Sequence, residues 1–116
     1  TDAELYLTED CDILLCAFGA TARVVKSAVN EARAQGIKAG LFRPKTLWPF
    51  PVKELNEAAK SAKKLLSVEM SMGQMIDDIK LAINCSKPVE FYGRTGGVIP
   101  NPAEILAEIK KVGGAE

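Results

Sequence analysis

Two glycine-containing loops have the composition of anion-binding sites. Gly19-Ala20-Thr21 leads directly into a predicted helix, whose first backbone N–H groups attract negative charge. Gly93-Arg94-Thr95-Gly96-Gly97 adds a guanidinium to a glycine-rich loop, although several residues separate it from the next helix. Neither loop has the spacing of a dinucleotide-binding or Walker A motif. A tight turn and a bent loop are the commoner explanations, and Gly19, Thr21 and Arg94 are kept as candidate anion ligands.

The acidic residues do not form an acid–base pair. Glu69 ends a predicted strand, where a carboxylate could act as a base or a metal ligand, but no second carboxylate is close to it in the sequence. We therefore interpret Glu69 as a hydrogen-bonded structural or interface carboxylate. Asp77 and Asp78 are predicted to face water from a helix. Asp10 and Asp12 stand at the start of a strand, the wrong end for a receiver-type phosphorylation pocket.

The chain contains no histidine. This removes Ser–His triads, most zinc sites and the commonest general base from consideration. We expect no catalytic residue, no metal ligand and no bound cofactor in this chain.

One tryptophan and three methionines occur in or beside predicted loops. Trp48, with prolines on both sides of it, either forms an exposed contact patch or folds back onto its own core. Met70 and Met72 are either adaptable interface residues or core filling, and Met75 is expected in the core.

Apolar runs alternate with amphipathic segments along the chain. Predicted strands are Asp12–Phe18, Ile37–Phe42, Lys64–Glu69 and Pro88–Tyr92, with Ala3–Leu7 as a candidate edge strand. Predicted helices are Ala20–Gln35 with Gly36 after it, a segment opened by Pro51, Gly73–Asn84, and a segment capped by Asn101 with Glu104 at its third position. This alternation predicts a mainly parallel sheet with helices on both faces.

Ligands of such sheets bind beyond the carboxyl ends of the strands. The loops expected at that edge are Phe18–Thr21, Arg43–Phe50, Met70–Gln74 and Gly93–Asn101. They contain the unusual residues described above, so a site is expected there.

Composition and charge limit the classes of partner. The 116 residues are 47% hydrophobic and 26% charged, as in globular proteins. The 15 basic and 15 acidic residues are interspersed, which argues against nucleic acid as a partner. No apolar run approaches the roughly 20 residues that span a bilayer, so no membrane partner is expected.

Three cysteines, Cys11, Cys16 and Cys85, occur without CxxC spacing. This pattern favours a reducing compartment, and we predict a cytoplasmic protein. Cys16 lies in an apolar strand and is expected to pack as a small hydrophobic residue. Residues 1–116 are expected to form a single domain, a piece of a longer subunit, because the sequence lacks an initiator methionine.

Three longer segments carry a family resemblance. They are Leu41–Pro51 (LFRPKTLWPFP), Ser67–Met75 (SVEMSMGQM) and Tyr92–Pro100 (YGRTGGVIP). All three resemble the C-terminal domain of the α subunit of 2-oxoglutarate and 2-oxoisovalerate:ferredoxin oxidoreductases. The first strand with its Gly19 loop fits as well, and the resemblance covers nearly the whole chain in the same order.

A wider resemblance concerns the fold. Phe42–Pro51 followed by Glu69 is similar to the C-terminal domain of transketolase and of the β chain of pyruvate dehydrogenase's first component. That resemblance implies a three-layer α/β/α sandwich with a mostly parallel five-stranded sheet. It also implies an antiparallel edge strand, which here would be Ala3–Leu7.

The resemblance implies a part in oxidative decarboxylation. In that family a 2-oxoacid, coenzyme A and oxidised ferredoxin give an acyl-CoA, carbon dioxide and reduced ferredoxin, with thiamine diphosphate and iron–sulfur clusters as cofactors. This chain has neither a Gly-Asp-Gly motif nor a CxxCxxC run, so the family's catalytic residues cannot be placed on it. What the resemblance implies here is a structural and assembly domain that contacts the thiamine-binding domains. The implied contact residues are Thr46, Trp48, Pro49, Phe50, Glu69, Met70, Met72 and Gln74.

Two alternatives stay open. The domain could bind an anion such as a coenzyme A phosphate through the Gly19 and Arg94 loops. It could instead be an independent flavodoxin-like regulatory module, for which the sequence shows neither the flavin loops nor an acidic phosphoryl pocket.

Overall fold

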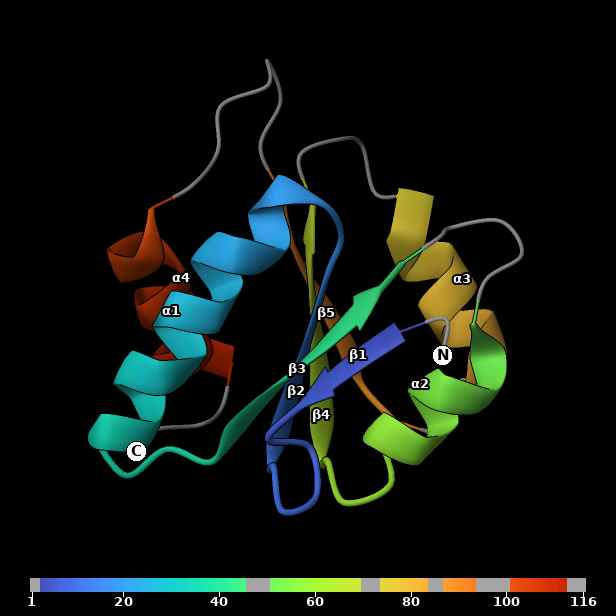
Figure 1. Cartoon of the computed structure of the whole chain (residues 1–116), viewed down its shortest axis with the longest axis horizontal. Helices are drawn as coiled ribbons and strands as arrows, with labels where there is room; N and C mark the ends of the chain where they lie inside the picture. The colour runs from blue at the N-terminus through green and yellow to red at the C-terminus, as the bar shows by residue number, and fades with distance from the viewer. Residues whose placement is uncertain (1–2, 46–50, 70–73, 84–86, 94–100, 113–116) are drawn as a thin grey trace.

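A five-stranded sheet forms the middle layer of the computed structural model (Figure 1). The structure describes residues 3–45, 51–69, 74–83, 87–93 and 101–112, without the side chains of residues 74–76 and 78. The strands are β1 (Ala3–Tyr6), β2 (Ile13–Ala17), β3 (Ala39–Pro44), β4 (Lys64–Glu69) and β5 (Val89–Gly93), in the order β1-β3-β2-β4-β5. β1 is antiparallel to β3, and the other three pairs are parallel.

Helices cover both faces of this sheet. They are α1 (Ala20–Ala34), α2 (Val52–Ala58), α3 (Gln74–Ala82) and α4 (Pro102–Val112). Figure 1 shows α1 with α4 on one side of the strands and α2 with α3 on the other. The predicted three-layer sandwich with an antiparallel edge strand is therefore confirmed.

The alternation of side chains along the central strands builds two separate cores. Leu15 on β2 and Leu66 on β4 face α1 and α4. Leu14 and Leu65, one residue earlier on each strand, face α2 and α3. Because β2 is covered on both faces, all of its residues are buried and its sequence is a continuous apolar run.

The ends of two helices follow the predicted signals. Gly36 has a φ of +87°, the left-handed conformation expected just after a helix. At the start of α4, the Glu104 N–H donates to Asn101 Oδ1 and the Asn101 N–H donates to Glu104 Oε1, both at 2.9 Å. This is a reciprocal cap, as the sequence predicted.

Most element boundaries lie within one or two residues of the sequence-based prediction, and two of the differences have a clear structural cause. The strand expected at Ile37–Phe42 runs from Ala39 to Pro44, because Arg43 and Pro44 pair with β1 instead of beginning a loop. The helix expected to contain Pro51 begins at Val52, with Pro51 as its capping residue. Neither change moves a side chain from one face of the sheet to the other.

Candidate functional site

The carboxyl ends of β2 and β4 mark a topological switch point. The chain leaves β2 towards α1 on one face of the sheet and leaves β4 towards α3 on the other face. The two strands are neighbours, with Ala17 opposite Val68. Crevices at such points are the usual binding sites of doubly wound sheets. The predicted candidates Gly19 and Thr21 follow β2, and Glu69 ends β4, so the fold places all three at the carboxyl edge of the sheet.

Gly19 makes the tight turn into α1. Its φ of +67° lies in the left-handed region, and an added Cβ would meet no atom of the described residues within 4 Å. Gly19 offers no side-chain cap to α1, and the first turn of this helix contains no acidic residue. Thr21 is buried, at 3% exposure. In the described part of the chain, the backbone N–H groups at this end of α1 are thus accessible to a ligand. The positive end of the helix dipole lies here, so it favours an anion.

Glu69 is held inside the protein. It is 7% exposed, and the fully buried Ser67 hydroxyl donates to its Oε2 at 2.8 Å. Ser67 lies opposite Cys16 in the sheet. Burial raises the pKa of the Cys16 thiol far above its ordinary value, and the charges of Cys11 and Glu69 add to the effect. The hydrogen-bonded carboxylate predicted from the sequence is confirmed. Its role at an interface stays a prediction.

A second feature at the same edge is a charged cleft between β1, β3 and the first turns of α1. It has a volume of about 470 Å³ and is lined by Glu4, Gly19, Ala20, Ala22, Arg23, Lys26, Leu41 and Arg43. Arg43 Nε donates to Glu4 Oε1 at 2.8 Å, and Lys26 Nζ donates to Glu4 Oε2 at 3.2 Å. Arg43, and after it Lys26, hold the pKa of Glu4 below its ordinary value. Arg23 adds a third cation to the lining.

Sequence reasoning missed this cleft. The sequence places Arg23 and Lys26 opposite the apolar residues of the predicted helix, which by itself indicates a solvent-facing position. Their spacing of three did place them on one face. The partner Glu4 is 22 residues from Lys26 and 39 from Arg43, so only the folded sheet reveals the pairing.

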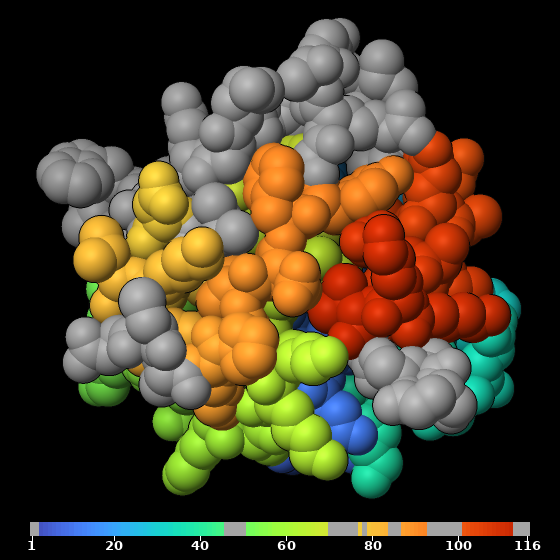
Figure 2. All heavy atoms as spheres, turned by 180° about the vertical axis from the view of Figure 1, so that it is seen from behind, coloured from blue at the N-terminus to red at the C-terminus, as the bar shows by residue number. Residues whose placement is uncertain are grey.

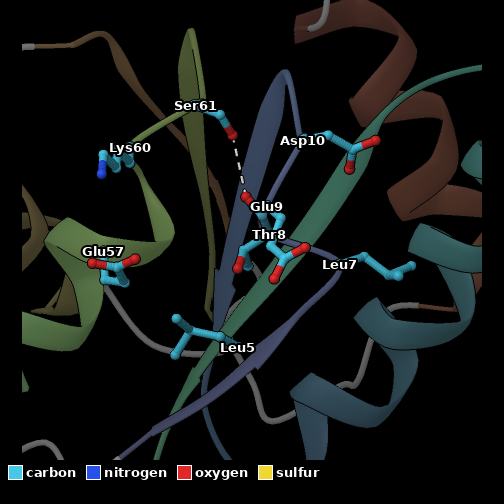
Figure 3. Close-up of a pocket in the computed structure, with 8 residues that line it drawn as sticks. All are labelled: Leu5, Leu7, Thr8, Glu9, Asp10, Glu57, Lys60 and Ser61. Carbon is cyan, nitrogen blue, oxygen red and sulfur yellow. Dashed lines mark hydrogen bonds between the residues drawn. The ribbon is translucent and has the colours of Figure 1, made fainter.

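A larger hollow lies at the opposite edge of the sheet (Figure 3). It has a volume of about 790 Å³ and is lined by Leu5, Leu7, Thr8, Glu9, Asp10, Glu57, Lys60 and Ser61. The Ser61 hydroxyl lies 3.1 Å from the carbonyl oxygens of Thr8 and Cys11 and donates to them. Asp10 is paired with Arg33 at 2.9 Å. These polar groups bind each other and present no nucleophile with an adjacent base, so we place the candidate site at the carboxyl edge despite the greater volume here.

Most of the other predicted site residues are not in the described part of the structure. Gln74 begins α3, but its side chain is not described. The rest fall outside the described residues and are Thr46, Trp48, Pro49, Phe50, Met70, Met72 and Arg94. Their contact roles stay predictions.

Three further features concern the described residues of the chain. These residues contain no group of three or more His, Cys, Asp or Glu side chains that could hold a metal ion. Cys11 and Cys16 are both buried free thiols. Within those residues, no helix is long and apolar enough to cross a bilayer.

The sequence profile of the pyruvate:ferredoxin oxidoreductase core domain II family matches residues 11–105. The chain belongs to this family. Core domain II as found here includes the switch-point crevice and the strands that form it, since the matched region runs from before β2 into α4.

Curated relatives of this core domain II are oxidoreductase subunits. The chain is 48% identical over 111 residues to ketoisovalerate oxidoreductase subunit VorB of Methanothermobacter marburgensis, covering 96% of this chain and 31% of the relative. It is 42% identical over 108 residues to 2-oxoglutarate synthase subunit KorA of the same organism, covering 93% of this chain and 29% of the relative. The chain therefore spans about a third of the length of the curated relatives it matches.

Solved structures agree with the fold. A chain of 2-oxoglutarate:ferredoxin oxidoreductase from Magnetococcus marinus, with 2-oxoglutarate, coenzyme A and succinyl-CoA bound, superposes with a TM-score of 0.80 at 25% identity. The match covers 96% of this chain and 19% of that one. A split-gene transketolase matches with a TM-score of 0.77 at 19% identity, over 94% of this chain and 40% of that one, which supports the transketolase-like fold alone.

Proposed function

We propose that this core domain II is an assembly domain of a thiamine-diphosphate-dependent 2-oxoacid:ferredoxin oxidoreductase. The whole enzyme would convert a 2-oxoacid, coenzyme A and oxidised ferredoxin into an acyl-CoA, carbon dioxide and reduced ferredoxin. The observation that carries this proposal is the family match over residues 11–105, together with relatives about three times as long. Residues 1–116 would form one domain of such a longer subunit.

The carboxyl edge of the sheet is the proposed contact surface with the thiamine-binding domains. Phe18, which follows β2 at this edge, is 41% exposed. An exposed phenylalanine ring beside a switch point is well suited to be buried against another domain. The predicted contact residues Trp48 and Met72 belong to the segments that follow β3 and β4, whose carboxyl ends lie at the same edge. The sequence did not identify Phe18 as a contact residue, because Phe18 is the last residue of a predicted buried strand.

The cofactors would be held by other parts of the parent protein. An iron–sulfur cluster is held by four cysteine thiolates, or by two with two histidines. The two described cysteines do not fit that need, because Cys11 and Cys16 are buried and burial raises the pKa of both thiols. The buried Glu69 is bound by Ser67. We therefore assign the catalytic groups and thiamine diphosphate to the other domains.

The proposed partners follow from the same reasoning. They are the remaining domains and subunits of the oxidoreductase, with ferredoxin as the electron acceptor of the whole enzyme. We place the protein in the cytoplasm because its cysteines show no disulfide spacing and the two described ones are free.

Paired surface variants test the contact surface. In the full-length parent enzyme, Phe18→Asp is expected to weaken subunit assembly in gel filtration and to lower 2-oxoacid- and coenzyme-A-dependent viologen reduction. The matched control is Leu81→Asp on α3, since Leu81 is even more exposed, at 76%, but lies near the end of α3 that is remote from the carboxyl edge. Trp48→Ala is expected to behave like Phe18→Asp.

Deletion of the domain tests the assembly role itself. Parent enzyme without core domain II is expected to be inactive and to regain viologen reduction when the 116-residue chain is added in trans. Full activity of the deleted enzyme would refute the assembly role. A loss caused by Leu81→Asp but not by Phe18→Asp would move the contact surface to α3.

A second candidate function is binding of an anion such as a coenzyme A phosphate. Gly19 and three cations, Arg23, Lys26 and Arg43, line one cleft at the carboxyl edge, which favours this alternative. The proposed ligands are Gly19, Thr21 and Arg94. Calorimetric titration of the chain with coenzyme A and with inorganic phosphate tests it, with Arg94→Ala and Arg43→Gln expected to abolish binding. If neither ligand gives a heat of binding, the anion-binding function is refuted and assembly remains the proposed function.

A further inference from the structure

Lysines from three parts of the chain gather at the amino edge of the sheet. Lys38 precedes β3, Lys63 and Lys64 stand at the start of β4, and Lys110 and Lys111 lie in the last turn of α4. Figure 2 shows the end of α4 (red) beside the start of β4 (yellow-green). Lys64 Nζ donates to the Val112 carbonyl at 2.9 Å, which joins these two segments. The gathering depends on the fold, because the sequence spreads these lysines over 74 positions.

Backbone hydrogen bonds fix the spacing between Lys38 and Lys63. The Asp12 N–H donates to the Lys38 carbonyl at 2.7 Å, and the Lys63 N–H donates to the Asp12 carbonyl at 2.8 Å. Lys38 and Lys63 therefore flank Asp12, one strand spacing away on each side. Two strand spacings place their backbones about 10 Å apart.

An apolar hollow lies between these lysines. It has a volume of about 270 Å³, and its lining is Asp12, Ile13, Gly36, Ile37, Lys38, Lys63, Lys64 and Ile109. Its charged lining consists of Lys38, Lys63, Lys64 and Asp12. Of its three isoleucines, Ile37 is partly exposed, whereas Ile13 and Ile109 are buried at 2% and 0% exposure. A hollow of this size admits one or two side chains of a partner, with the lysines around them.

The charges at this edge do not cancel. Lys38, Lys63, Lys110 and Lys111 have no ion pair among the described residues. Among the described residues of these segments (12–13, 36–38, 63–64 and 108–112), the five lysines outnumber the acids Asp12 and Glu108 by three, and Asp10 is neutralised by Arg33. The carboxyl ends of α1 and α4 contribute roughly half a negative charge each, which leaves about two positive charges. The edge is thus cationic in a chain whose net charge is zero.

We propose that this lysine-rimmed hollow binds an acidic polypeptide segment of a partner protein. Carboxylates of the segment pair with Lys38 and Lys63, and an apolar side chain between them packs against the partly exposed Ile37. Charge complementarity selects this occupant, and the apolar lining distinguishes it from a simple polyanion. The surface lies at the opposite edge from the proposed contact with the thiamine-binding domains, so the two proposals stand or fall separately.

A labelled peptide pair tests the proposal on the 116-residue chain. The probe is fluorescein-labelled Glu-Asp-Leu-Glu-Asp-Leu-Glu, and its uncharged counterpart is Gln-Asn-Leu-Gln-Asn-Leu-Gln. Fluorescence anisotropy is expected to show binding of the acidic peptide only, weakening as salt rises, because the Debye length falls from about 10 Å at 0.1 M to about 3 Å at 1 M. Amide NMR shifts are expected to change at Lys38, Lys63 and Ile37.

Charge-reversal variants locate the site. Lys38→Glu with Lys63→Glu is expected to weaken binding at least about tenfold, equivalent to about 1.4 kcal/mol. The control is Lys53→Glu with Lys80→Glu, which makes the same change in net charge on α2 and α3. All four side chains are exposed, so circular dichroism is expected to be unchanged.

Four results would overturn the proposal. They are an equal loss in both double variants, equal binding of the two peptides, tighter binding of a single-stranded oligonucleotide than of the acidic peptide, and binding that appears only when the chain is shortened to end at Val112. The last result would make the chain's own end the occupant.

Discussion

Glu4 and Arg43 are direct cross-strand partners, and the Arg43 guanidinium donates to the Glu4 carboxylate at 2.8 Å. The same carboxylate accepts from Lys26 on α1, and the Lys26 ammonium lies 4.5 Å from the centroid of the Tyr6 ring. One acid therefore joins the short edge strand β1 to both β3 and α1. Apolar contacts also hold β1, since Ala3 is buried and the partly buried Leu5 and Tyr6 pack against the two cores.

Replacement of Glu4 is expected to lower stability in a pH-dependent way. Glu4→Gln should reduce the free energy of unfolding by up to about 1 kcal/mol near neutral pH, since partly exposed ion pairs contribute little more. The folded-state pKa of Glu4 is lowered, so its contribution is full above the ordinary value of 4.5 and is lost as pH falls through the folded value. Urea unfolding of both proteins across this range measures the difference. The control Glu57→Gln, at an exposed position on α2, should show no such pH dependence.

Gly40 is expected to tolerate no side chain. A Cβ at this position would lie 2.7 Å from the Leu7 carbonyl oxygen and 3.2 Å from the Cys11 Sγ. Arg33 Nη2 holds that carbonyl at 2.8 Å, so the obstacle cannot move freely. Gly40→Ala should cost about 1–3 kcal/mol of unfolding free energy, as overpacked sites do. Complete rescue by Cys11→Ala would show that the thiol, and not the backbone, is the obstacle.

Ser67 and Glu69 are expected to be energetically coupled. Removal of the Ser67 hydroxyl leaves a buried carboxylate with one donor fewer, so Ser67→Ala should destabilise the protein by about 1–3 kcal/mol. Glu69→Gln should cost less in the Ser67→Ala background than in the wild type. A double-mutant cycle measured by thermal unfolding tests this, and strictly additive effects would mean that the 2.8 Å hydrogen bond contributes little.

Cys11 and Cys16 are expected to resist alkylation in the folded protein. Both thiols are buried, and burial is the largest cause of their raised pKa values. Thiolate is the reactive form, so iodoacetamide should label these cysteines only at the rate of unfolding. Mass spectrometry of the Cys85→Ser variant, with and without urea, follows these two thiols alone. Rapid labelling of either one without urea would indicate a local opening of the sheet.

Much of the fold followed from local patterns. The apolar run at Ile13–Ala17, the spacing of Ala22, Val25 and Val29, and the cap at Asn101 each predicted the element that forms there. Local patterns were less informative at Arg43 and Pro44, where the strand continues because β1 pairs with it from a distant part of the chain. The candidate residues Gly19 and Glu69 could be placed at the carboxyl edge, because the order of elements decides which loops meet there.

The sequence by itself determined the order of strands and helices, the faces they bury and the lack of histidine chemistry, because these depend on residue type and short-range spacing. Only the tertiary structure decided which charges meet. Lys26 and Arg43 share Glu4, Arg33 holds Asp10, and Lys38 lies across Asp12 from Lys63. These contacts join residues more than 20 positions apart, and strand pairing together with the packing of α1 on the sheet sets their distances. For that reason the cationic edge of a neutral chain became visible only in the folded protein.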